Sequence, residues 1–110
     1  MEHLLRNALI GNAAALGLNW IYDMPFLERL SKKQDILFLK PDQTLYDQSK
    51  KSYFAYPNAT IGDVSFQGNI AVWLYQTLKQ NPQYPFDQYD DLIYEHIKEG
   101  SDYQGYIEAY

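Results

Sequence analysis

"GNAAALGLNWIYD", residues 11–23, decides the expected fold, because it continues a helical pattern and ends it with polar and aromatic residues. Apolar residues recur here at the three- and four-residue steps of an amphipathic helix: Leu5, Ala8, Leu9, Ala13, Leu16 and Trp20. The pattern predicts a first helix from Glu2 to Ile21, with Asn12 on its inward side. Asn19 follows Asn12 by seven residues, which would place two amides about two turns apart on one face.

Two further helices are expected on either side of a long irregular segment. Asp23 is placed to cap a short second helix that has a proline in its first turn. Residues 33–62 show no helical or alternating period, and "DILFL", residues 35–39, is either a strand or an extended segment. Long irregular loops of this kind are often functional. A third helix, apolar on nearly all sides and therefore expected to be central and buried, should begin near Ser65.

The C-terminal part predicts a fourth helix and the start of another. The fourth should run from Asp87, its cap, to Glu99, with Gly100 ending it. The last ten residues, "SDYQGYIEAY", carry no terminating signal and are typical of a helix that has only begun. Together these patterns predict an all-α, irregular multi-helix fold in a single, partial domain over residues 1–110.

An unfinished last helix would leave apolar side chains uncovered. We therefore expect exposed apolar surface at Tyr106, Ile107 and Tyr110, and either a homo-oligomer or a partner chain at the C-terminus that covers it.

Composition excludes several classes of protein. Hydrophobic residues make up 46% of the 110 positions, which argues against disorder. A net charge of -5 argues against nucleic-acid binding. There are no cysteines, so thiolate metal sites and cysteine nucleophiles are excluded. No signal peptide and no membrane-spanning run are visible, which predicts a cytoplasmic protein without a membrane partner.

Few residues are suited to chemistry. His3 is expected to be exposed, and His96 lies on the apolar stripe of the fourth helix, as either a satisfied core histidine or a ligand or base. Two linked groups remain as candidates for a cleft or ligand site. The first group is the pair of amides near Trp20, and the second is the turn of residues 62–69 at the start of the third helix. Such a turn favours anions and ligands, because the N–H groups of a helix N-terminus are free. The inward amides of Asn12 and Asn19 could equally bond each other or a loop carbonyl. The candidates are Asn12, Asn19, Trp20, Tyr22, Asp23, Asp63, Ser65, Gly68 and Asn69.

Three segments resemble the ADP-ribosylglycohydrolase family, in particular its bacterial branch. Residues 11–23 align without a gap with an "ADALSLGxHWIYD"-like segment of that branch. "GDVSFQGNIAV", residues 62–72, is similar to its "GDxTHYGDQAL", and "DYQGYIE", residues 102–108, to its "DYxGYID". The segments occur in the same order and span nearly the whole chain.

The resemblance implies an all-α hydrolase fold of which this chain is the N-terminal part. It also implies removal of ADP-ribose from modified side chains or related small molecules, with two magnesium ions that activate water for attack on the ribose C1. Magnesium prefers oxygen ligands and is therefore held by carboxylates. Asp63, which keeps its carboxylate, is the candidate metal ligand among the matched positions.

Several matched positions depart from the family pattern. Asn12 and Asn69 stand where the branch has Asp, Asn19 where it has His, and Phe66 and Gln67 where it has His and Tyr. An amide supplies neither the negative charge that binds a dication nor a base near neutral pH. We therefore expect a polar cleft without its ionisable groups, no bound magnesium and no turnover, as in a pseudoenzyme. The family's second acidic cluster lies beyond the matched part, which predicts a truncated gene, a fragment or one piece of a split protein.

Three functions follow as hypotheses. The first is a degenerate ADP-ribosylglycohydrolase-like protein. The second is a non-catalytic module that binds a nucleotide or an ADP-ribose-like small molecule through amides and aromatics. The third is an interaction domain whose many tyrosines form a partner surface.

Overall fold

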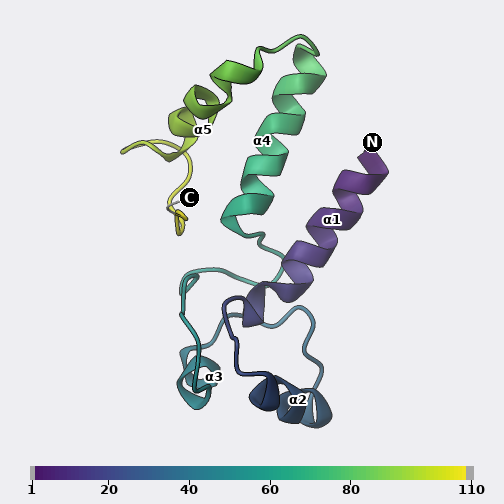
Figure 1. The fold of residues 1–110 in the computed structure, drawn as a ribbon, viewed down its shortest axis with the longest axis vertical. Coiled ribbons are helices and arrows are strands. Elements are labelled where there is room, and N and C mark those ends of the chain that lie inside the picture. The colour runs from purple at the N-terminus through teal and green to yellow at the C-terminus, as the bar shows by residue number, and fades with distance from the viewer. Residues whose placement is uncertain (1, 109–110) are drawn as a thin grey trace. The chain divides into compact units, whose positions relative to one another are not determined.

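The computed structural model of the chain describes residues 2–108 and is built of helices (Figure 1). The chain divides into two compact units, unit 1 (Met1–Ser65) and unit 2 (Phe66–Tyr110). The described residues form five α-helices and two short 3-10 helices, with no named strand. The all-α expectation is therefore confirmed. No helix in residues 2–108 is long and apolar enough to cross a membrane.

The first helix is shorter than expected. α1 (Glu2–Ala15) gives way to a 3-10 turn, η1 (Leu16–Leu18), so the predicted end at Ile21 is wrong. The segment after the second helix packs closely against this end. The Phe38 N–H donates to the Ala14 carbonyl at 2.8 Å, and a Cβ at Gly17 would clash with the Leu39 carbonyl oxygen. A tertiary contact thus satisfies the end of α1.

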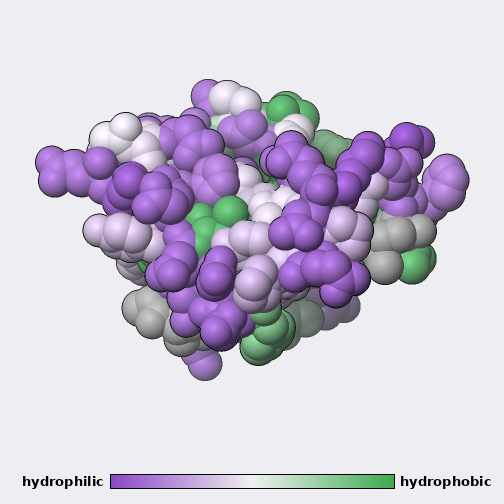
Figure 2. All heavy atoms as spheres, turned by 90° about the horizontal axis from the view of Figure 1, so that it is seen from above, coloured by the Kyte–Doolittle hydropathy of each residue, from purple (hydrophilic) through white to green (hydrophobic). Residues whose placement is uncertain are grey.

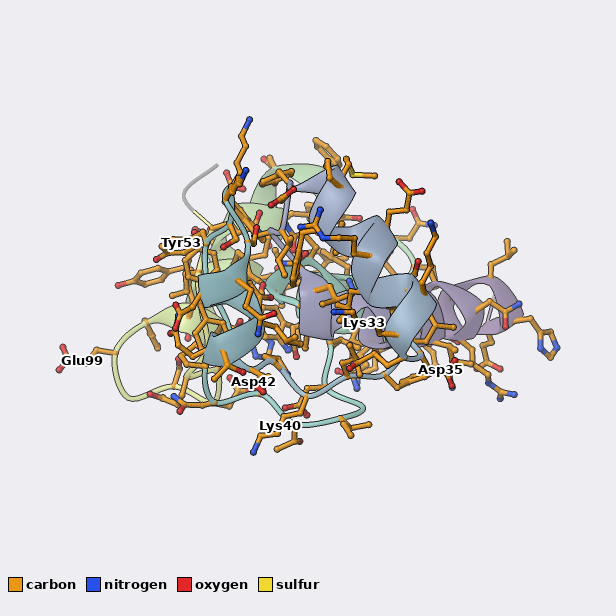
Figure 3. The ribbon with its side chains drawn as sticks, turned by 90° about the horizontal axis from the view of Figure 1, so that it is seen from below. Lys33, Asp35, Lys40, Asp42, Tyr53 and Glu99 are labelled. Carbon is orange, nitrogen blue, oxygen red and sulfur yellow. The ribbon has the colours of Figure 1, made fainter. Side chains whose placement is uncertain are left out.

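The second helix, α2 (Met24–Lys33), confirms the expected cap. The Asp23 carboxylate accepts the Phe26 N–H at 3.2 Å, and Pro25 lies in the first turn. Residues 33–62 are less irregular than expected, because they include α3 (Gln43–Gln48). Asp42 caps α3 by accepting the Thr44 N–H at 2.9 Å, and Figure 3 shows Asp42 beside Lys40 at this end of the helix. A helix of six residues is too short to show a period. Residues 35–39 form no strand.

The core of unit 1 joins α2, α3 and the bridge that follows η1. Its buried members are Ile21, Phe26, Leu30 and Tyr46. Partly buried apolar side chains pack around them: Leu18, Leu27, Ile36, Leu45 and Phe54. This cluster holds the segment of residues 19–23, which contains four of the nine candidate residues.

Unit 2 contains α4 (Phe66–Gln80), η2 (Phe86–Gln88) and α5 (Tyr89–Ile97). The bounds of α4 confirm the expected third helix. Its burial was overestimated, because only Phe66, Gly68 and Trp73 are buried on it. A small unit with one neighbouring helix has too little chain to cover every side of an apolar helix.

The end of the chain differs from the expected helices in two ways. Asp87 does not cap α5; Gln88 stands at the N-cap and makes no side-chain cap bond. Residues 101–108 are not helical. The Tyr103 N–H instead donates to the His96 carbonyl at 3.1 Å, and its hydroxyl donates to the Tyr106 carbonyl at 2.7 Å. These bonds fold the segment back onto α5, so no helix begins here.

The apolar surface expected near the C-terminus is present only in part. Ile107 is 43% exposed, whereas Tyr106 is half-buried, and Tyr110 lies outside the described residues. Figure 2 shows one face of the molecule, on which hydrophilic residues predominate and hydrophobic areas are small.

Candidate functional site

Asn12 uses both ends of its amide within unit 1. Its Oδ1 accepts the Ser65 N–H at 2.7 Å, and its Nδ2 donates to the Ser65 hydroxyl at 2.7 Å. Ser65 is buried and directly precedes α4. The pair therefore ties the last turn of α1 to the loop that ends unit 1. The amide has a structural partner, but that partner is neither Asn19 nor a loop carbonyl, the two that we considered from the sequence.

Asn19 does not share a face with Asn12. The seven-residue spacing aligns side chains only within one continuous α-helix, and α1 ends before Asn19, whose backbone is extended with φ -59° and ψ 136°. The expected stack of two amides is therefore wrong. The Asn19 carbonyl accepts the Tyr46 hydroxyl at 2.7 Å, and burial raises the pKa of Tyr46 to about 12.

Asp23 holds two segments of unit 1 together. One oxygen accepts the Phe26 N–H of α2, and the other accepts the Lys50 N–H at 2.9 Å. These two backbone hydrogen bonds, with the Lys50 bond the larger cause, hold the pKa of Asp23 below its usual value. The carboxylate is thus engaged in structure rather than directed at a ligand.

Trp20, Tyr22 and Tyr53 form an aromatic patch on unit 1. The ring centroids of Trp20 lie 6.2 Å from those of Tyr22 and 5.9 Å from those of Tyr53, both in edge-to-face geometry. Tyr22 is 58% exposed and Tyr53 is 53% exposed. Trp20 is half-buried, and Tyr53 lies at the surface of the unit (Figure 3). This aromatic patch is the candidate site that the residues support best.

A backbone bridge positions the aromatic patch. Ile21 pairs with Ser52 in an antiparallel bridge, in which the Tyr53 N–H donates to the Trp20 carbonyl at 3.0 Å. Neighbouring residues in extended chain point to opposite sides, so Ile21 enters the core while Tyr22 remains exposed. Trp20 has φ +66°, a left-handed conformation that costs a bulky residue roughly 1–3 kcal/mol.

The contribution of Tyr53 was missed from the sequence. It lies two residues after the basic pair Lys50 and Lys51, and the Tyr22 N–H donates to the Lys51 carbonyl at 2.8 Å. The run "KKSY" thus lies beside "WIY" in space. A tyrosine next to a basic pair was a visible signal, but only the bridge shows that the two segments meet.

Asp63 is engaged in a turn. Its Oδ2 accepts the Thr60 N–H at 2.9 Å. Within residues 2–108, no group of three or more His, Asp or Glu side chains is arranged to hold a metal ion.

Gly68 and Asn69 belong to the first turn of α4, in unit 2. Gly68 is buried and Asn69 is half-buried. Asn12 and the aromatic patch belong to unit 1.

The two histidines lie where a structural role predicts them, His3 at the surface and His96 in a packed position. His3 is exposed. The His96 ring stacks on Trp73 with centroids 4.3 Å apart and planes 2° from parallel, and its Nδ1 lies 3.0 Å from the Asp102 carboxylate. Tyr103 packs edge-on against Trp73 at 5.7 Å. His96 is thus part of the packing between α4, α5 and the C-terminal segment.

Comparison of the chain with protein-family models, with curated proteins and with solved structures gives no match.

Proposed function

We propose that this chain is a non-catalytic, ADP-ribosylglycohydrolase-like module that binds ADP-ribose or a closely related nucleotide on its aromatic patch. The observation that carries the proposal is the exposed aromatic patch beside Lys50 and Lys51. Aromatic rings stack on a nucleobase, and lysines attract phosphates. We choose ADP-ribose as the ligand because three segments of the chain resemble the ADP-ribosylglycohydrolase family.

The non-catalytic part of the proposal is supported by the polar residues. Asn12 is bonded to Ser65, Asp23 caps α2, and Asp63 closes a turn. Hydrolysis with two metal ions needs several carboxylates free to hold both ions and to orient water. Each of these side chains already has a structural partner, so none is free for that task.

Thermal unfolding with ADP-ribose, with and without magnesium, tests the binding. A ligand at about ten times its Kd stabilises the folded state by about 1.4 kcal/mol, and we expect this shift without magnesium. Replacing Tyr22 and Tyr53 with alanine should weaken binding, since a stacked base contributes roughly 1–3 kcal/mol per ring. Tyr94→Ala, which removes an equally exposed tyrosine from unit 2, is the matched control.

Release of ADP-ribose from arginine- or serine-linked substrates tests the absence of turnover. The unmodified chain should release none, and neither should the double variant Asn12→Asp with Asn69→Asp, because two carboxylates are still too few for two metal ions. Magnesium-dependent release by the unmodified chain would overturn the non-catalytic proposal. Absence of any shift with ADP-ribose would favour an interaction domain instead.

A further inference from the structure

The charge of the chain is unevenly divided between the two units. Residues 1–65 contain seven acidic and seven basic residues, so their formal charges cancel. Residues 66–110 contain seven acidic residues and two lysines, and therefore carry the whole net charge of -5. A partner that binds this chain through charge should therefore be positively charged and should bind unit 2.

One face of α5 is turned to its own unit and the other to solvent. The half-buried residues form the apolar stripe expected from the sequence: Tyr89, Leu92, Ile93, His96 and Ile97. The solvent side, with the 3-10 turn before it, forms what we call the acidic-aromatic face: Phe86, Asp87, Asp90, Asp91 and Tyr94. Residues three and four apart are neighbours on a helix, so these side chains adjoin.

The aromatic members of this face are unusually open. Phe86 is 84% exposed and Tyr94 is 60% exposed. The Phe86 ring is nevertheless held, because its centroid lies 5.1 Å from that of Tyr89, which in turn stacks on Tyr84 at 5.8 Å. A positioned, exposed aromatic loses little side-chain entropy when it contacts a partner.

The carboxylates of the face are available. No ion pair joins Asp87, Asp90 or Asp91 to any residue of the described chain, and there is no Lys or Arg between positions 80 and 97. Glu95, one turn further on, is instead paired with Lys98 at 2.7 Å. Acidic residues in the first turn of a helix stabilise it through the helix dipole, which is a sufficient reason for Asp90 and Asp91. The dipole gives no reason for the exposed aromatic residues on either side of them, Phe86 and Tyr94.

We propose that the acidic-aromatic face is a docking surface for an arginine-rich segment of another protein. A guanidinium group pairs with a carboxylate through two parallel hydrogen bonds and also stacks on an aromatic ring. The face offers both features within adjacent turns, so one arginine meets Asp91 together with Tyr94, and a second meets Asp90 with Phe86. The surface lies in unit 2, so the proposal does not depend on nucleotide binding by unit 1.

Titration of the full chain with an acetylated, amidated peptide of alternating Arg and Gly tests this proposal. In ¹H–¹⁵N spectra, the largest shift changes should fall at residues 86–95, and the affinity should fall as salt screens the charges. A peptide of alternating Asp and Gly should not bind. Shift changes centred elsewhere, or absent at millimolar peptide, would overturn the proposal on the unmodified protein.

Variants separate a specific surface from general attraction to an acidic protein. Asp90→Asn with Asp91→Asn should weaken peptide binding at least about threefold, because each exposed charge pair contributes modestly. The control Asp35→Asn with Glu99→Gln removes the same charge from other exposed positions, both marked in Figure 3. An equal loss in the control would show general attraction only and refute the docking surface.

The aromatic half of the surface has its own control. Phe86→Ala should also weaken binding of the Arg-Gly peptide, while Tyr22→Ala, an exposed aromatic of unit 1, should leave it unchanged. Circular dichroism of each variant establishes that the helices are retained. Unchanged affinity in folded Phe86→Ala would mean that the ring takes no part and would overturn the pairing proposed here.

Discussion

Replacing Asn12 with alanine is expected to destabilise unit 1 measurably. The change removes two hydrogen bonds of 2.7 Å to Ser65, which is only 5% exposed. A buried N–H left without an acceptor costs about 1–3 kcal/mol, and that is the expected loss in the free energy of unfolding. For a chain of this size it corresponds to a fall in Tm of roughly 4–20 °C.

Urea unfolding followed by circular dichroism measures this loss, and two variants control for other effects. Asn7→Ala changes the same residue type at an exposed position of α1 and should shift stability by less than about 0.5 kcal/mol. Asn12→Asp should be tolerated far better than alanine, since a carboxylate still accepts the Ser65 N–H and the serine hydroxyl can rotate to donate. If Asn12→Ala unfolded at the same urea concentration as Asn7→Ala, the Asn12–Ser65 tie would carry no stability and the reasoning would fail.

Three further predictions concern the backbone and the titrating groups of unit 1. Gly17→Ala should destabilise the chain by roughly 1–3 kcal/mol, because its Cβ would clash with the Leu39 carbonyl. Gly11→Ala should instead stabilise the chain by about 0.5–1 kcal/mol, because a Cβ at this position of α1 meets no other atom. Thermal melts should show a lower Tm for the first variant and a higher Tm for the second. Tyr46→Phe should cost about 1 kcal/mol, and ultraviolet titration of the unmodified chain should show one tyrosine ionising near pH 12. Because the folded pKa of Tyr46 is raised from 10, stability should fall as pH rises from about 10 to about 12. Because the folded pKa of Asp23 is lowered, the stability that it contributes should be complete above its usual pKa of 3.8 and be lost as pH falls through the folded pKa. Acid unfolding of Asp23→Asn beside the unmodified chain measures this loss.

Local sequence was sufficient wherever the signal and the structure involve the same few residues. The Asp23 cap acts on a backbone N–H three residues later, so residue order alone predicted α2. The apolar face of α5 follows from periodicity, which is a property of one helix. The apolar run that begins near Ser65 was in the same way enough to predict α4. The all-α class, which is the sum of such signals, was predicted for the same reason.

What only the tertiary structure decided depends on residues far apart in the chain. The end of α1 is satisfied by Phe38, and Asn12 is bonded to Ser65 across 53 positions, so neither the shortened helix nor the role of the amide could be read from the segment itself. The aromatic patch likewise exists because a bridge brings Tyr53 to Trp20. Periodicity in the sequence indicates which side of a helix or strand is apolar. The partner of each polar group depends instead on how the loops bring distant segments together, and a local sequence pattern does not predict that.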